Sequence, residues 1–118
     1  MAKILLAEDD TLTRSTLAKF LRASGYDVEV AADGAQALSR LNQQNFDLIL
    51  SDVVMPNGNG WDLVDHISSI APKTRVLLMT AYSALRRTGK ETGTVPEVIL
   101  KPLILTELLT KIQKLLGQ

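Results

Sequence analysis

Short apolar runs alternate along this chain with segments whose apolar residues recur at helical spacing. The alternation is typical of βαβ units, in which each helix crosses back over a mainly parallel sheet between two strands. The predicted strands are residues 3–7, 27–31, 46–51, 74–79 and 97–100. The first, third and fourth runs lack polar alternation, as central strands covered on both faces do, whereas the second alternates and suits an edge.

Helices are predicted between these strands from apolar residues spaced three and four apart. Gly25 stands where a glycine that ends the first helix belongs, and the second helix is entered through Asp33 and Gly34. Pro72 is expected to end the third helix. The apolar positions that indicate the four clear helices are Leu17, Phe20 and Leu21, then Ala37, Leu38 and Leu41, then Leu63, Val64, Ile67 and Ile70, and finally Leu105, Leu108, Leu109, Ile112, Leu115 and Leu116.

The segment between the last two strands predicts a degraded fourth helix. Only Ala84 and Leu85 form an apolar patch there before two glycines and Pro96 interrupt the pattern. We therefore expect one or two helical turns, then an irregular segment that is mobile over about residues 86–94.

Length and composition favour one compact globular domain over residues 1–118. Apolar residues make up 46% of the chain and charged residues 22%, unlike a disordered protein. Thirteen basic and thirteen acidic side chains balance, so no overall field would hold the chain on nucleic acid or an anionic membrane. The sequence has no cysteine and no membrane-spanning or signal-like stretch, and a cytoplasmic location is expected.

Polar side chains stand at the ends of four of the predicted strands. The acidic run 8–10 comes at the end of the first strand, Asp52 at the end of the third, Thr80 of the fourth and Lys101 of the fifth. Because ligands of a doubly wound sheet gather at the carboxyl ends of its strands, we expect these side chains to share a site.

The chemistry expected of this site is phosphoryl transfer. At least three carboxylates at one edge cannot all stay ionised unless cations compensate them, and the sequence supplies only Lys101 there. We expect a divalent ion to supply the rest of the positive charge, and oxygen ligands without His or Cys suit Mg²⁺. With that ion bound, Asp52 acts as a nucleophile toward phosphorus, Lys101 offsets phosphoryl charge and the Thr80 hydroxyl donates to the group.

Each of these residues also has an ordinary structural explanation. Asp10 or Thr11 is expected to cap the next helix, and a threonine leaving a strand is often only a strand former. Lys101 before a proline suits a solvated loop. Taken jointly, at four strand ends of one edge, the residues are better explained as a functional site.

Four stretches of the chain resemble the response regulator receiver domain of two-component signalling, in its single-domain type, over essentially the whole length. They are ILLAEDD at 4–10, DLILSDVVMPNGNGWDL at 47–63, VLLMTA at 76–81 and VILKPLILTELLTKI at 98–112. The resemblance implies a single doubly wound five-stranded parallel sheet with the flavodoxin-like strand order 2-1-3-4-5 and helices on both faces.

The resemblance also implies roles for the acidic side chains. Asp52 would accept a phosphoryl group from a phosphohistidine on a sensor histidine kinase or a histidine phosphotransfer protein. Asp9 would bind Mg²⁺ directly, together with Asp52 and the backbone carbonyl of Val54, while Glu8 helps through water.

The remaining roles follow from the same resemblance. Thr80 would be the switch hydroxyl and Lys101 the cation that pairs with the phosphoryl group, with a cis peptide bond between Lys101 and Pro102. The side chains of Val54 and Tyr82 would border the site and tune the lifetime of the phosphoryl group.

Phosphorylation in this family shifts a population of conformations, and a downstream protein reads the surface of the fourth helix, fifth strand and last helix. The resemblance thus implies no enzyme beyond catalysis of the domain's own phosphorylation and dephosphorylation. We expect no nucleic acid or membrane partner, and a monomer or weak dimer. The chain departs from the pattern at Val98, where an aromatic residue normally stands, and lacks the usual Gly-Ala near the fifth strand.

Two other classes of function compete with this interpretation. One is a receiver-like protein-interaction module whose phosphorylation switch is atypical or absent, which Val98 favours and the intact site residues oppose. The other is an enzyme, either a flavodoxin-like flavin carrier or an aspartate-nucleophile phosphatase. The acidic run 8–10 would repel a flavin phosphate, and the first strand lacks the Asp-x-Asp motif of those phosphatases.

Three further features have both structural and functional interpretations. For Trp61, packing of the turn is favoured over contact with a partner. His66 lies within the third helix without metal-ligand company and is expected to be a surface residue. The apolar run 103–105 is either a docking patch or core.

Overall fold

The computed structural model describes residues 1–57, 60–70, 73–81 and 97–118. Within these ranges the chain forms a five-stranded parallel sheet in the order β2-β1-β3-β4-β5, which confirms the predicted doubly wound fold and strand order. The elements are β1 (Lys3–Ala7), α1 (Thr11–Ala23), β2 (Asp27–Ala31), α2 (Gly34–Gln43), β3 (Leu48–Asp52), α3 (Gly60–Ile70), β4 (Arg75–Thr80), β5 (Glu97–Leu100) and α4 (Leu105–Leu115).

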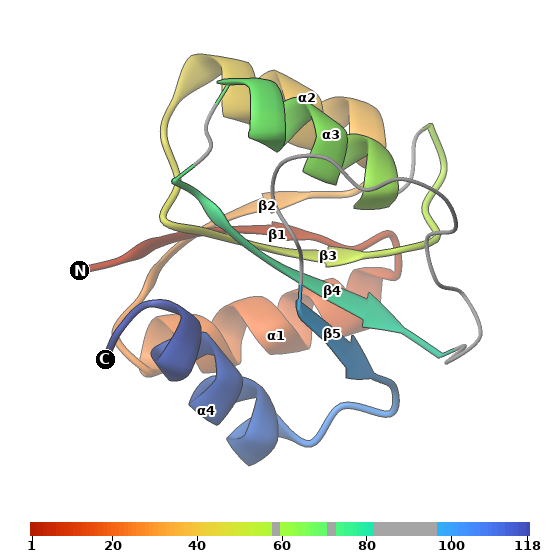
Figure 1. Ribbon diagram of the computed structural model, residues 1–118. Coiled ribbons are helices and arrows are strands. Elements are labelled where there is room, and N and C mark those ends of the chain that lie inside the picture. Colours follow the sequence, from red (N-terminus) through yellow and green to blue (C-terminus); the bar gives the residue numbers. More distant parts are fainter. Residues whose placement is uncertain (58–59, 71–72, 82–96) are drawn as a thin grey trace.

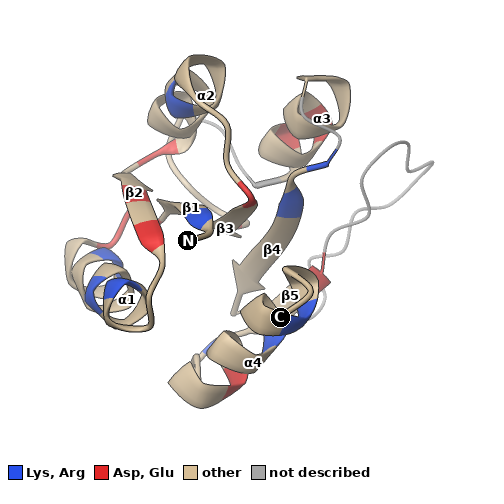
Figure 2. Ribbon diagram, turned by 90° about the vertical axis from the view of Figure 1, so that its left-hand side faces the viewer, with Lys and Arg blue, Asp and Glu red and all other residues tan. Residues whose placement is uncertain are grey.

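Helices cover both faces of the sheet, as predicted. Figure 1 shows α2 and α3 on one face and α1 and α4 on the other, with the carboxyl ends of the strands at the edge away from both chain termini. Figure 2 shows the same layers from the side, with acidic and basic residues interspersed over the elements. Across the described ranges, none of the helices has the length and apolar character needed to cross a membrane.

Strand β3 shows how one sheet builds two cores. Its alternate side chains point to opposite faces, so Leu48 and Leu50 pack on the side of α1 and α4, while Ile49 packs on the side of α2 and α3. All five residues of the strand are buried. Full burial of a Leu or Ile side chain contributes about 1.5–3 kcal/mol, so β3 is held firmly on both faces. This anchoring fixes the position of Asp52, the last residue of the strand.

Two strand boundaries differ from the prediction. The third strand is observed at Leu48–Asp52 and the fourth at Arg75–Thr80, one or two residues later than expected. Phe46 and Thr74 are buried, but the Thr74 hydroxyl donates to the Phe46 carbonyl at 2.9 Å, so a side-chain bond links these residues just before the strands begin. At their carboxyl ends, β3 and β4 include Asp52 and Thr80, which are paired with residues of the neighbouring strands.

The predicted helix signals hold at α1 and α2. Asp10 caps α1 by accepting from the backbone N–H of Thr13 at 2.8 Å, and Asp33 caps α2 by accepting from that of Gln36 at 2.8 Å. Gly25 follows α1 with a φ of 98°, the left-handed conformation that commonly ends a helix.

Several predictions concern residues outside the described ranges. They are the ending of the third helix by Pro72, the position of Tyr82 beside the site, the degraded fourth helix and the mobile segment at 86–94. The last helix predicted from the sequence is α4.

Candidate functional site

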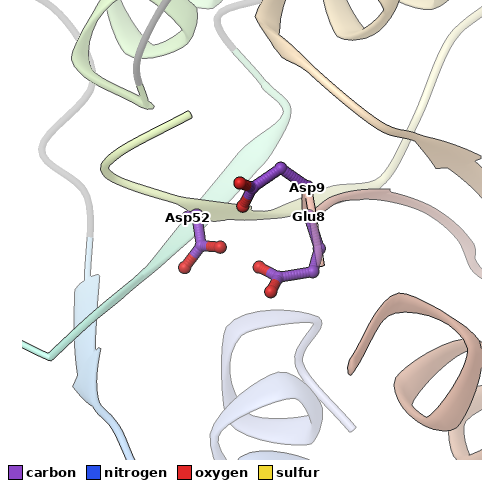
Figure 3. Close-up of side chains that lie close together, drawn as sticks. All are labelled: Glu8, Asp9 and Asp52. Atoms are coloured by element: carbon purple, nitrogen blue, oxygen red, sulfur yellow. The ribbon is translucent and has the colours of Figure 1, made fainter. Parts of the chain in front are cut away.

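Three carboxylates converge at the carboxyl ends of β1 and β3. Glu8 and Asp9 follow β1 directly, and Asp52 ends the neighbouring strand β3. One carboxylate oxygen from each residue lies within 4.8 Å of the other two. Figure 3 shows the side chains of Glu8 and Asp9 extending toward Asp52. The structure therefore brings together the acidic side chains that strand topology predicted to meet.

Lys101 supplies positive charge to this cluster. Its Nζ lies 2.6 Å from Oδ1 of Asp52 and 3.6 Å from Oε2 of Glu8. The backbone N–H of Lys101 donates to the Thr80 carbonyl at 2.8 Å, which ties the residue to the end of β4, and the peptide bond to Pro102 is cis as expected. One amine faces three carboxylates, so the cluster keeps an excess of negative charge.

The acidic groups nearest Lys101 are poorly solvated. Glu8 and Asp52 are only 1% and 5% exposed. Burial raises the pKa of the Asp52 carboxyl above its ordinary value, and the hydrogen bond and charge of Lys101 oppose this only in part. Any further positive charge at the cluster would favour the ionised form of Asp52.

The donor atoms of the cluster suit a magnesium ion. Among the buried side-chain N and O atoms that the structure describes, only Oε2 of Glu8 lacks a hydrogen-bond partner. Its 3.6 Å separation from Nζ of Lys101 is an electrostatic contact and is too long for a hydrogen bond. An orphaned carboxylate oxygen beside two further carboxylates fits the all-oxygen environment that Mg²⁺ and its bound waters require.

The six residues predicted to be catalytic or to bind the metal line one cavity of about 270 Å³. They are Glu8, Asp9, Asp52, Val54, Thr80 and Lys101. Thr80 is buried at the end of β4, whereas Val54 is exposed at the rim. A larger hollow of about 640 Å³ lies at the amino ends of β3 and β4 and is lined by none of these residues. The smaller cavity is therefore the candidate site.

Asp10, the third acid of the run 8–10, has a different role. Its carboxylate accepts from the hydroxyl of Thr13 at 2.6 Å and from the backbone N–H of Thr13 at 2.8 Å. These two bonds, the hydroxyl first, lower the pKa of Asp10. Asp10 is thus the cap of α1, while the two acids before it join Asp52.

Sequence reasoning overlooked two residues that support the site. Arg14 donates from Nη1 to the Glu8 carbonyl at 2.9 Å, and the same nitrogen lies 3.4 Å from the Asp9 carbonyl. The buried Ser51 donates its hydroxyl to the Asp52 carbonyl at 2.9 Å. Neither contact follows from a periodic pattern, although a basic residue in the helix after an acidic strand end was a visible signal.

Two of the residues with open interpretations make structural contacts. Trp61 is partly buried and packs against the core on the side of α2 and α3, as favoured from the sequence. His66 lies at the surface of α3, where its Nε2 is 3.2 Å from Oδ1 of Asn42 on α2. This contact supports the expected surface role.

The apolar run 103–105 divides between core and surface. Leu103 and Leu105 are partly buried against the core on the side of α1 and α4. Ile104, between them, is 55% exposed. The run is therefore mainly an anchor for the start of α4, with one exposed apolar side chain.

Comparison with known proteins identifies the family. A family model described as the response regulator receiver domain matches residues 4–113. The chain belongs to the response regulator receiver family. Receiver domains are signalling modules of two-component systems and not classical enzymes, and they interact with histidine kinases and downstream regulators.

Curated relatives include both short and long proteins. The response regulator receiver protein CpdR of Brucella abortus is 35% identical to this receiver domain over 117 residues, with 98% of each chain covered. The probable transcriptional regulatory protein SilR of Salmonella typhimurium is 34% identical over 116 residues, which are 97% of this chain. This receiver domain spans 50% of the length of SilR.

Solved structures of similar proteins support the same family. The chemotaxis response regulator CheY4 of Vibrio cholerae has 32% sequence identity and a TM-score of 0.84, with 98% of each chain covered. The response regulator protein TrrA of Thermotoga maritima, solved in complex with Mg²⁺ and BeF, has 30% identity and a TM-score of 0.87. That comparison covers 98% of this receiver domain and 99% of TrrA.

Proposed function

We propose that Asp52 accepts a phosphoryl group from a phosphohistidine of a sensor histidine kinase or histidine phosphotransfer protein, in a reaction that depends on Mg²⁺. The observation that carries this proposal is the placement of Asp52 at the end of a buried strand, 2.6 Å from Nζ of Lys101 and beside two further carboxylates. A rigid nucleophile, a fixed cation and an oxygen-lined site are what phosphoryl transfer requires.

The residues of this chain have distinct roles in that reaction. A carboxylate oxygen of Asp52 forms the new bond to phosphorus as the bond from phosphorus to the donor's imidazole nitrogen breaks, and the imidazole leaves with the electron pair. Lys101 offsets the charge of the phosphoryl oxygens, because its amine already lies against Asp52. The buried Thr80 hydroxyl, at the end of β4, donates to the phosphoryl group once it is attached.

Glu8, Asp9, Asp52 and the backbone carbonyl of Val54 would hold the magnesium ion. When bound, Mg²⁺ supplies the charge neutralisation that lets a carboxylate approach an anionic phosphoryl group. The orphaned Oε2 of Glu8 and the excess negative charge of the cluster support this assignment.

The test of the proposal is intact-protein mass spectrometry after incubation with acetyl phosphate, a small phosphoryl donor. With Mg²⁺ present, the mass should increase by one phosphoryl group, and with EDTA it should not. A mass that stays unchanged in Mg²⁺, in protein shown to be folded, would count against phosphoryl acceptance.

Thr80→Val is expected to separate phosphorylation from its structural consequence. Valine keeps the shape of threonine but removes the hydroxyl. Asp52 should therefore still bind beryllofluoride, a phosphoryl mimic, but the hydrogen bond from the Thr80 hydroxyl to the bound group is lost. Amide chemical shifts of β5 and α4 should respond to Mg²⁺ and beryllofluoride in wild type and in Thr80→Ser, but not in Thr80→Val. A full response in Thr80→Val would show that the hydroxyl is not the switch.

One observation favours a second candidate, an interaction module that phosphorylation does not control. Val98, which stands where receivers normally carry an aromatic switch residue, is 40% exposed on β5. The same spectra decide this question, because in such a module the shifts of β5 and α4 would not change in wild type either.

We further propose that residues 1–118 act as one receiver domain whose surface is read by a downstream protein. The compact sheet with a core on each face supports a single domain. The monomeric or weakly dimeric state, the cytoplasmic location and the absence of nucleic-acid binding stay predictions.

A further inference from the structure

Arg14 reaches from the start of α1 back to the loop that carries two of the three clustered acids. Its Nη1 donates to the Glu8 carbonyl at 2.9 Å and makes a longer contact of 3.4 Å with the Asp9 carbonyl. The guanidinium is thus bound to the main chain of the loop. The function proposed above gives this arginine no role.

The two carbonyls that Arg14 contacts belong to the two peptide units on either side of the Asp9 Cα. Peptide units are planar, so the φ and ψ angles of Asp9 are set by how these two planes are turned relative to each other. A donor that holds both carbonyl oxygens therefore limits both angles. Those angles set the direction of the Asp9 Cα–Cβ bond relative to the two planes, and together with the side-chain torsions this direction determines where the carboxylate points.

The rest of the loop is held by other contacts. The backbone N–H of Glu8 donates to the Ala31 carbonyl at 3.0 Å, and the side chain of Asp10 is bound by Thr13. These bonds fix the two ends of the loop, and the contacts of Arg14 fall between them at Asp9.

We propose that Arg14 is a positioning residue of the metal site, which raises affinity for Mg²⁺ by holding the Asp9 backbone so that its carboxylate faces Asp52. This proposal rests on the proposed function, because it takes Mg²⁺ as the ion of the cluster. Partners that orient metal ligands in other proteins typically change metal affinity about 10–100-fold when they are mutated.

Because Arg14 is positively charged, the direction in which Mg²⁺ affinity changes on its removal distinguishes positioning from simple electrostatics. By Coulomb attraction and repulsion alone, removing a positive charge near three carboxylates should strengthen the binding of a cation. Loss of positioning should instead weaken it. A decrease in Mg²⁺ affinity on removal of Arg14 therefore cannot come from its charge.

The experiment is calorimetric titration of the full chain with MgCl₂. Two variants are used: Arg14→Ala removes the side chain, and Arg14→Met keeps much of the aliphatic stem without its N–H donors, which protects the fold. Both should bind Mg²⁺ about tenfold more weakly than wild type.

Arg22→Ala is the matched control. Arg22 lies on the same helix and makes the same kind of bond, from Nη2 to the Val28 carbonyl at 2.8 Å, but at the end of α1 away from the acids. This variant should lose stability in thermal unfolding yet keep the wild-type affinity for Mg²⁺. An equal loss of affinity in Arg22→Ala would reduce Arg14 to a general structural role and overturn the proposal.

The remaining outcomes are distinguishable. If wild type binds Mg²⁺ and Arg14→Met binds it equally well or more tightly, the positioning role is wrong while the proposed function stands. If folded wild type binds no Mg²⁺ at all, the proposed function fails first and the role of Arg14 fails with it.

Discussion

Asp52→Asn will abolish the phosphoryl mass that wild type acquires from acetyl phosphate and Mg²⁺. Asparagine has nearly the same shape as aspartate, but its amide lacks the carboxylate nucleophile that attacks phosphorus. Asp52 is almost fully buried at the end of β3, so the substitution changes the chemistry of the site without changing the surface. The measurement is intact-protein mass spectrometry over a time course, and we expect complete loss.

The matched control for this variant is Asp27→Asn. Asp27 is also an aspartate of the sheet, but it is exposed at the amino end of β2, at the opposite edge from the cluster. It should acquire the phosphoryl mass at the wild-type rate. A stable phosphoryl mass on Asp52→Asn would mean that another group accepts phosphate and would remove Asp52 from its proposed role.

Lys101→Met will have three separable effects. Phosphoryl incorporation should slow about 100-fold, because a charged donor aimed at the transferred group is lost. In EDTA the free energy of unfolding should fall by about 1–3 kcal/mol, less than for a fully buried pair because the Lys101 side chain is 28% exposed. Mg²⁺ should bind more tightly, since the amine no longer competes for the carboxylates.

Lys111→Met tests whether these effects belong to the site. Lys111 also pairs with a carboxylate, Glu97, at 3.4 Å, but both side chains are well exposed. A pair of that kind contributes about 0–1 kcal/mol, so stability, Mg²⁺ affinity and phosphoryl incorporation should all stay near wild type. If Lys101→Met kept the stability, Mg²⁺ affinity and phosphoryl incorporation of wild type, as Lys111→Met should, the ion pair with Asp52 would have no role in phosphoryl transfer.

The opposite responses expected of Lys101 and Arg14 variants show how the two cations differ. Lys101 faces the carboxylate oxygens and competes with a metal ion, whereas Arg14 faces carbonyl oxygens and orients the chain. Removing the first should strengthen Mg²⁺ binding, and removing the second should weaken it.

The convergence of the site could be predicted because it follows from topology. In a parallel doubly wound sheet the carboxyl ends of all strands lie on the same side of the molecule. Polar residues that follow apolar runs are therefore brought near one another, regardless of the loops between the strands. The same reasoning placed Lys101 beside Asp52, although their strands are separated by β4. Continuous apolar runs were sufficient to locate β1, β3 and β4, because these three strands are almost entirely buried.

Features that depend on individual side-chain bonds could not be predicted in the same way. β3 and β4 start later than predicted, and the Thr74 hydroxyl bonds the Phe46 carbonyl just before them. No propensity encodes that pairing. The contact of Arg14 with Glu8 and Asp9 crosses a strand-to-helix loop, where neither the two-residue nor the 3.6-residue period applies.

The most direct test of phosphoryl acceptance at Asp52 is calorimetric titration of the Mg²⁺-saturated protein with beryllofluoride. We expect saturable binding of one equivalent to wild type, no binding when EDTA replaces Mg²⁺, and no binding to Asp52→Asn in either condition. Absence of binding to folded, Mg²⁺-saturated wild type, or binding that needs neither Mg²⁺ nor Asp52, would contradict the claim that these acids and Lys101 form a phosphoryl-accepting site.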